Sequence, residues 1–124
     1  MNIFERNVPG TREILSKKTI AIAGCGGIGS NAAVSLTRAG IGHLILADFD
    51  RVEPSNLNRQ QYNLDDIGKP KTEALAQHLK RIHPEICLTL LNQRLTPDNL
   101  IPLMGNADLL IEAFDLAENK EWLI

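Results

Sequence analysis

Short apolar runs alternate along this chain with segments whose apolar residues recur at helical spacing. The runs are rich in β-branched residues or leucine, which is typical of strands buried in a sheet. They predict strands from Thr19 to Ala23, His43 to Ala47, Ile86 to Leu91 and Asp108 to Ala113. The segments between and after them predict helices from Ile28 to Ala39, from Lys69-Pro70 to Ile82, from Pro97 to Met104, and from Asp115 onward.

Capping residues support these helix boundaries. Gly40 follows the first predicted helix and is a typical C-cap. Pro70 is tolerated in the first turn of the second helix, and the His83-Pro84 pair ends it. The long stretch between Asp48 and this helix is rich in amides and reads as loop.

Strands that alternate with helices imply right-handed crossovers and a parallel sheet covered on both faces. We therefore predict an α/β, Rossmann-like fold, and a length of 124 residues suits a single domain. The chain stops at Trp122-Leu-Ile124, in what reads as mid-helix, and four strands would leave an unpaired sheet edge. We expect a fold truncated after the fourth strand, with residues 1–124 forming the N-terminal part of a single domain.

Composition narrows the class of protein. The net charge is −2 and 44% of residues are apolar, so neither a nucleic acid nor an anionic membrane is expected as the main partner. No apolar run approaches the ~20 residues that span a bilayer, and the N-terminus lacks the apolar core of a signal peptide. Cys25 and Cys87 form no disulfide framework, which favours a reducing, cytoplasmic location.

A glycine loop follows the first predicted strand. Gly24, Gly26 and Gly29 match the G-x-G-x-x-G pattern, with Gly27 as an additional glycine. Such a loop lets the backbone approach a phosphate, which the free N–H groups of the following helix then bind. Asp48 lies 19 residues beyond Gly29 and ends the next strand, where a carboxylate holds ribose hydroxyls. The alternative is a purely structural tight turn.

The cysteine of the glycine loop and two histidines do not require a catalytic or metal-binding role. Cys25 lies near a helix N-terminus that can stabilise a thiolate, but the role we expect for it is to fill the small gap under the loop. His78 and His83 have no carboxylate or cysteine arranged around them, so we expect no metal site there.

Donor side chains gather after Asp48 and exceed what a dinucleotide needs: Asn56, Asn58, Arg59, Gln60 and Lys71. A triphosphate carries about two more negative charges than a dinucleotide pyrophosphate, and arginine and lysine bind phosphate oxygens well. Asp115, after the fourth strand, is placed to hold Mg²⁺ against the phosphates. Solvated loop charges and a helix N-cap are the alternative for these residues.

At this point the sequence resembles a known family. The stretches GCGGIGS, AGIGHLILADFDRVEPSNLNRQ, IGKPK and EAFD are similar to the adenylating domain of the ThiF/MoeB family, relatives of ubiquitin-activating enzymes. The resemblance covers essentially the whole chain. The lead-in FERNVPG is most similar to the thiamine-pathway, ThiF-like branch.

The resemblance implies a role for each site residue. The glycine loop would wrap the phosphates of ATP and Asp48 would hold the ribose. Phosphate contacts would come from Asn56, Arg59 and Lys71, with Gln60 orienting the Arg59 loop. Asp115 would bind magnesium, and Arg6, or Arg12 in its place, would reach the ATP of a neighbouring subunit in a homodimer.

The implied reaction is adenylation. The C-terminal glycine carboxylate of a ubiquitin-like sulfur carrier, ThiS-like, would attack the α-phosphate of ATP and release pyrophosphate. A carboxylate with a pKa of about 3.5 is already ionised at neutral pH, so no general base is required.

The sequence also departs from the family pattern. Leu116 stands where asparagine usually follows the magnesium aspartate, Lys120 stands where arginine is common, and the zinc-binding C-X-X-C pairs are absent. Two other functions therefore stay open: a nucleotide-binding module without turnover, and an NAD-dependent oxidoreductase.

Overall fold

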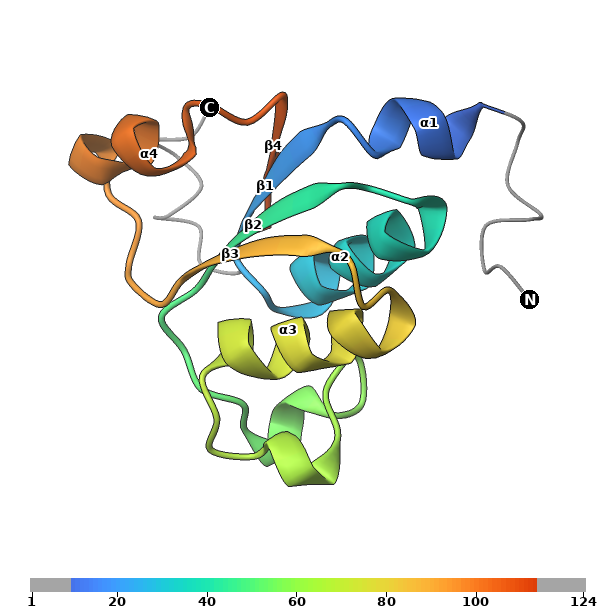
Figure 1. Ribbon diagram of the computed structural model, residues 1–124. Helices are drawn as coiled ribbons and strands as arrows, with labels where there is room; N and C mark the ends of the chain where they lie inside the picture. Colours follow the sequence, from blue (N-terminus) through green and yellow to red (C-terminus); the bar gives the residue numbers. More distant parts are fainter. Residues whose placement is uncertain (1–9, 114–124) are drawn as a thin grey trace.

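A computed structural model describes residues 10–113 and gives a parallel sheet of four strands (Figure 1). The strands are β1 (Thr19–Ala23), β2 (His43–Ala47), β3 (Cys87–Leu91) and β4 (Leu109–Glu112). Their order in the sheet is β3-β2-β1-β4, and every neighbouring pair is parallel. The predicted Rossmann-like α/β fold is confirmed. Because β1 lies between β2 and β4, the chain reverses direction across the sheet beside β1, which is where such folds place ligands.

Helices cover the two faces of the sheet unequally. The helices α2 (Gly27–Ala39) and α3 (Lys71–Ile82) lie on one face, and α4 (Pro97–Met104) lies over the other, near the carboxyl ends of the strands (Figure 1). A short helix, α1 (Thr11–Leu15), precedes β1. In the part of the chain that the structure describes, no helix is long and apolar enough to cross a membrane.

Side chains of the central strands point alternately to the two faces of the sheet and form one apolar cluster on each face. One set of strand side chains, Ile20, Ile22, Leu44 and Leu46, packs against α2 and α3. The opposite set, Ala21, Ala23, Ile45 and Ala47, packs with Leu95 and Met104 beneath α4. Full burial of a large aliphatic side chain stabilises a fold by about 1.5–3 kcal/mol. These clusters hold the ends of β1 and β2 in fixed positions, and the candidate site lies just beyond those ends.

The observed boundaries differ from the predicted ones in small ways. Pro70 is the N-cap of α3 and not a residue of its first turn, and β3 begins one residue later than predicted. Gly40 does cap α2, and its N–H donates to the carbonyls of Leu36 and Thr37.

Three short helices were not predicted: α1, and the 3₁₀ helices η1 (Pro54–Asn56) and η2 (Leu64–Asp66). They are too short to show apolar periodicity. Side chains within each 3₁₀ segment cap it: the N–H of Glu53 donates to Asn56 Oδ1 and the N–H of Asn63 to Asp66 Oδ2, both at 2.8 Å. The helix predicted from Asp115 lies outside the described residues.

Candidate functional site

The glycine loop joins β1 to α2 through an unusually close backbone contact. Gly24 has a φ of 106°, a conformation that favours glycine. A Cβ on Gly29 would lie 1.8 Å from the carbonyl oxygen of Gly24, so no other residue fits there without moving the loop. The N–H of Ser30 donates to Gly26 in the first turn of α2. The loop thus places the free N–H groups of the helix start at the carboxyl end of β1, where they can bind an anion.

Cys25 is a packing residue of this loop. Its side chain is fully buried and its Sγ contacts the carbonyl of Ala47 at 3.8 Å. Burial, reinforced by the nearby Asp48 carboxylate, raises the pKa of the Cys25 thiol well above its ordinary value. The thiol therefore stays protonated, which agrees with the packing role expected of Cys25.

Asp48 ties the glycine loop to the end of β2. One carboxylate oxygen accepts the N–H of Cys25 and the other accepts the N–H of Asp50, both at 2.7 Å. Burial raises the pKa of Asp48, while the two backbone donors and the Lys71 ammonium partly oppose that rise. Each oxygen keeps a further lone pair, so Asp48 can still accept hydrogen bonds from ligand hydroxyls.

Four of the predicted site residues line one pocket of about 200 Å³: Asn56, Arg59, Gln60 and Lys71. The pocket is also lined by Asp50, Arg51 and Glu53, which no sequence pattern marks as site residues. Three cationic side chains therefore face two carboxylates. Asn56 Oδ1 already accepts the N–H of Glu53, so only its amide nitrogen remains to donate to a ligand.

Lys71 and Gln60 are the unusual members of this pocket, because each is a polar side chain that is only 5% exposed. Neither polar atom of the Gln60 amide has a hydrogen-bond partner among residues 10–113. No carboxylate of residues 10–113 forms an ion pair with the Lys71 ammonium. A buried amide without hydrogen-bond partners costs free energy, and so does a buried ammonium without an ion pair, so the two groups at one pocket indicate a ligand site. For Lys71, the alternative of a solvated loop charge is wrong.

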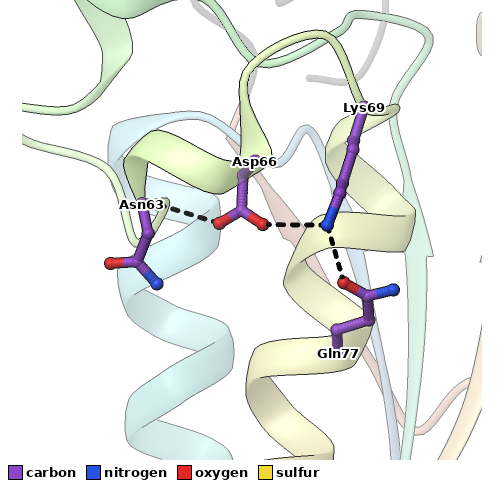
Figure 2. A network of polar contacts seen from close by, with 4 residues as sticks. All are labelled: Asn63, Asp66, Lys69 and Gln77. Carbon is purple, nitrogen blue, oxygen red and sulfur yellow. Dashed lines mark hydrogen bonds and ion pairs between the residues drawn. The ribbon is translucent and has the colours of Figure 1, made fainter.

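Lys69, the other lysine of the G-K-P-K stretch, has partners within the chain. Figure 2 shows Lys69 between Asp66 and Gln77, with its Nζ 3.6 Å from Asp66 Oδ1 and 3.2 Å from Gln77 Oε1. These three residues line a separate polar pocket of about 150 Å³. Lys69 is therefore engaged in a local surface network, and Lys71 alone of this pair faces the candidate site.

Arg59 is exposed and extends over the glycine loop. A Cβ on Gly27 would lie 3.9 Å from Arg59 Cγ and Nε, so the arginine stem rests on that glycine. The guanidinium donates to the carbonyl of Ser55 at 3.1 Å and to Asn58 Oδ1 at 3.3 Å. The contact joins the pocket to the glycine loop, and both lie at the carboxyl ends of β1 and β2.

Several predicted residues lie elsewhere or outside the description. Arg6 and Asp115 fall outside residues 10–113, as do Leu116 and Lys120. Arg12 packs against Gly40 at the C-terminal end of α2, opposite the glycine loop. No group of three or more His, Cys, Asp or Glu side chains within residues 10–113 is arranged to hold a metal ion, which includes His78 and His83.

Sequence reasoning also missed the residues that join the two halves of the site. Asn31 and Ser30 of α2 hydrogen-bond to the segment from Arg59 to Gln61, and Tyr62 Oη donates to the carbonyl of Cys25 at 2.5 Å. These contacts connect positions about 30 residues apart in sequence. No local pattern marks them, although a tyrosine directly after an amide-rich loop is a weak signal for a buried anchor.

Comparison with known proteins identifies the class. A profile of the ThiF family matches residues 2–124, and this chain belongs to that family. It is 40% identical over 107 residues to the sulfur carrier protein ThiS adenylyltransferase of Escherichia coli strain K12, covering 86% of this chain and 42% of that protein. It is 39% identical over 105 residues to the molybdopterin-synthase adenylyltransferase of the same strain, covering 84% of this chain and 42% of the relative.

The fold has a solved counterpart with nucleotide bound. The crystal structure of the E. coli tRNA N6-threonylcarbamoyladenosine dehydratase TcdA in complex with ATP aligns with a TM-score of 0.82 at 36% identity, covering 86% of this chain and 44% of that one. The chain thus spans less than half the length of these relatives.

Proposed function

We propose that the protein to which this chain belongs is an ATP-dependent adenylyltransferase. The observation that carries the proposal is the pocket where Lys71 and Gln60 are buried, the Gln60 amide has no hydrogen-bond partner among residues 10–113, and Arg59 reaches over the glycine loop. Those groups need a ligand that is anionic, rich in acceptors and long enough to touch the loop and the pocket together. A nucleoside triphosphate meets all three requirements.

In this proposal each described residue has a definite task. The N–H groups of the glycine loop and the Lys71 ammonium bind phosphate oxygens, and Arg59 adds a planar pair of donors. Gln60 and the amide nitrogen of Asn56 donate hydrogen bonds inside the pocket. Asp48 accepts from the ribose hydroxyls. Residues 1–124 then form the N-terminal part of one adenylation domain.

Magnesium enters the proposal through Asp115. Protein sites that handle nucleotides commonly hold Mg²⁺ with one or two carboxylates and complete its coordination with phosphate oxygens and water. A single carboxylate from the chain therefore suffices, and Asp115 stays the predicted ligand. The metal would neutralise charge on the leaving pyrophosphate.

The proposed substrate is the C-terminal glycine carboxylate of a ubiquitin-like sulfur carrier, ThiS-like. One carboxylate oxygen forms a bond to the α-phosphorus of ATP while the bond from that phosphorus to the bridging oxygen of the β-phosphate breaks. An acyl-adenylate and pyrophosphate result, and no proton is transferred. The site therefore acts by holding two anions together and stabilising the developing charge.

The choice of carrier is supported by similarity to a ThiS adenylyltransferase, which covers 86% of the chain. Other relatives are named for molybdopterin synthase and for a modified tRNA. The choice of a ThiS-like carrier therefore goes further than the choice of an adenylyltransferase and needs its own test. We also propose a homodimer in which Arg6 of one subunit reaches the ATP of the other.

Carrier-dependent exchange of labelled pyrophosphate into ATP tests the proposal. The natural full-length protein is assayed with a ThiS-like carrier ending in Gly-Gly, and with the same carrier lacking its last glycine as the control. We expect exchange only with the intact carrier, and Arg59→Ala should reduce it by about 10²–10³, the usual loss for one charge-stabilising group. ATP binding without exchange would instead favour a module without turnover.

A further inference from the structure

Two segments that are far apart in sequence form a hydrogen-bonded latch beside the pocket. The first is the opening turn of α2, and the second runs from Arg59 to Tyr62. The Nδ2 of Asn31 donates both to the carbonyl of Gly27 at 2.6 Å and to the carbonyl of Arg59 at 2.9 Å. The Oδ1 of Asn31 accepts from Gln61 Nε2 at 2.7 Å. One amide group thus bridges the glycine loop and the arginine loop.

Two further bonds hold the same segments together. The N–H of Gln61 donates to Ser30 Oγ at 3.1 Å, and the buried Tyr62 hydroxyl donates to the carbonyl of Cys25. Burial, with smaller effects from neighbouring groups, raises the pKa of Tyr62, so its hydroxyl remains a donor across the physiological pH range. These two anchors would hold the chain near Tyr62 even without Asn31.

Asn31 differs from these anchors because it acts on Arg59 itself. The carbonyl that it fixes belongs to the residue whose side chain rests on Gly27. Without this bond, the Arg59 backbone can rotate between its anchors at Asn56 and Gln61, since the Arg59 N–H donates only weakly, at 3.4 Å, to Asn56. A shift there moves the guanidinium relative to the glycine loop.

We propose that Asn31 is a positioning residue that holds Arg59 in a fixed position relative to the glycine loop, so that both contact one phosphate chain. This inference rests on the proposed function, because it concerns how Arg59 is positioned in the proposed ATP site. Asn31 suits the task because a short amide supplies two donors and one acceptor on a rigid helix. It touches the loop that carries Arg59 and acts on the nucleotide through that arginine.

A double-mutant cycle tests the proposal on the natural full-length protein. The dissociation constant for Mg·ATP is measured by calorimetry for the wild type, Asn31→Ala, Arg59→Ala and the double variant. We expect Asn31→Ala to weaken binding about 10-fold in the wild-type background and less than about 2-fold when Arg59 is already alanine, since residues in one network are coupled. The control is Ser35→Ala, an exposed change one turn further along α2.

A ligand-free readout accompanies the cycle. Hydrogen exchange at the Gln61 amide, which donates to Ser30, should quicken in Asn31→Ala and stay unchanged in Ser35→Ala. If Asn31→Ala proves unstable, Gln61→Ala removes one bond of the latch without touching α2, and a smaller loss of affinity with the same dependence on Arg59 is expected.

The outcomes separate the two proposals. If the wild type does not bind Mg·ATP, the proposed function fails and this inference falls with it. If the wild type binds ATP but Asn31→Ala binds equally well, or loses the same factor in both backgrounds, the positioning role alone is overturned.

Discussion

Lys71 is the residue whose environment is hardest to explain without a ligand. Lysine is almost never buried unless it is paired, yet this side chain is 5% exposed and forms no ion pair with a carboxylate of residues 10–113. Its backbone N–H is anchored to the carbonyl of Asp50, so the helix start fixes where the ammonium lies. The proposed triphosphate would supply an ion-pair partner for this ammonium inside the pocket.

Replacement of this ammonium should separate binding from stability. In Lys71→Met an apolar chain of similar length removes a buried charge that no carboxylate of residues 10–113 pairs with, so we expect an unchanged or higher free energy of unfolding. Affinity for Mg·ATP should fall roughly 10- to 100-fold, the worth of one hydrogen bond to a charged group. Urea unfolding and calorimetric titration measure the two effects.

Lys69→Met is the matched control. Lys69 belongs to the Asp66–Gln77 network (Figure 2) and does not line the pocket, so its removal should leave ATP affinity within about 2-fold of wild type. A Lys71→Met protein that loses stability but keeps its affinity would assign Lys71 a structural role.

At the scale of elements, the turn from β1 into α2 sets how closely the backbone can approach a ligand. The two glycines at the start of α2 face very different surroundings: a Cβ on Gly29 would strike backbone at 1.8 Å, whereas a Cβ on Gly27 would meet only the Arg59 stem at 3.9 Å. The pair therefore offers a test in which the same chemical change is made two residues apart.

Gly29→Ala should destabilise the fold strongly. The added methyl group must push α2 away from Gly24, and overpacking of this kind typically costs about 1–3 kcal/mol, more when backbone must move. Gly27→Ala should fold with stability equal to or slightly above wild type, because alanine favours helix by up to about 1 kcal/mol. Urea unfolding of both variants gives the comparison, and equal stabilities would contradict the described loop geometry.

Local sequence was sufficient for the strands and for α2, α3 and α4. Each is long enough, and regular enough, for apolar spacing and caps such as Gly40 to define it. Pattern alone gave no sign of α1, η1 and η2, because segments of five residues or fewer have no period to measure. The side-chain caps of η1 and η2, such as Asn56 on Glu53, become visible only once the segment is folded.

The residues of the candidate site could be predicted from the sequence, but their burial and their contacts could not. The glycine loop and Asp48 follow from their positions after β1 and β2, and the donors at Asn56, Arg59, Gln60 and Lys71 stand out by composition. Which of these donors is buried depends on tertiary packing, and so does the latch from Asn31 to Arg59. Sequence spacing alone could not reveal either.

For the whole molecule, the chain belongs to the ThiF family, and its described part contains a four-stranded parallel sheet. It spans about 42% of the two E. coli adenylyltransferases to which it is similar. The net charge of −2 suits a compact anionic substrate bound in a local cationic pocket better than a long polyanion. In the proposed homodimer, each ATP site would contain residues of both subunits.

Subunit mixing tests whether Arg6 acts across the dimer. Arg6→Ala and Arg59→Ala should each be nearly inactive in carrier-dependent pyrophosphate exchange. When the two full-length variants are refolded together, heterodimers contain one intact site made from both chains. Random pairing should then restore about a quarter of wild-type activity. No recovery, together with a monomer in sedimentation at micromolar concentration, would contradict the shared site.

The most direct test of the central claim is a pair of calorimetric titrations of the natural full-length protein, one with Mg·ATP and one with NADH. A pocket built for a triphosphate chain should bind Mg·ATP with a dissociation constant that Lys71→Met raises at least about 10-fold, and should show no saturable binding of NADH. Saturable binding of NADH, or no binding of Mg·ATP, would contradict the claim that this pocket receives a nucleoside triphosphate.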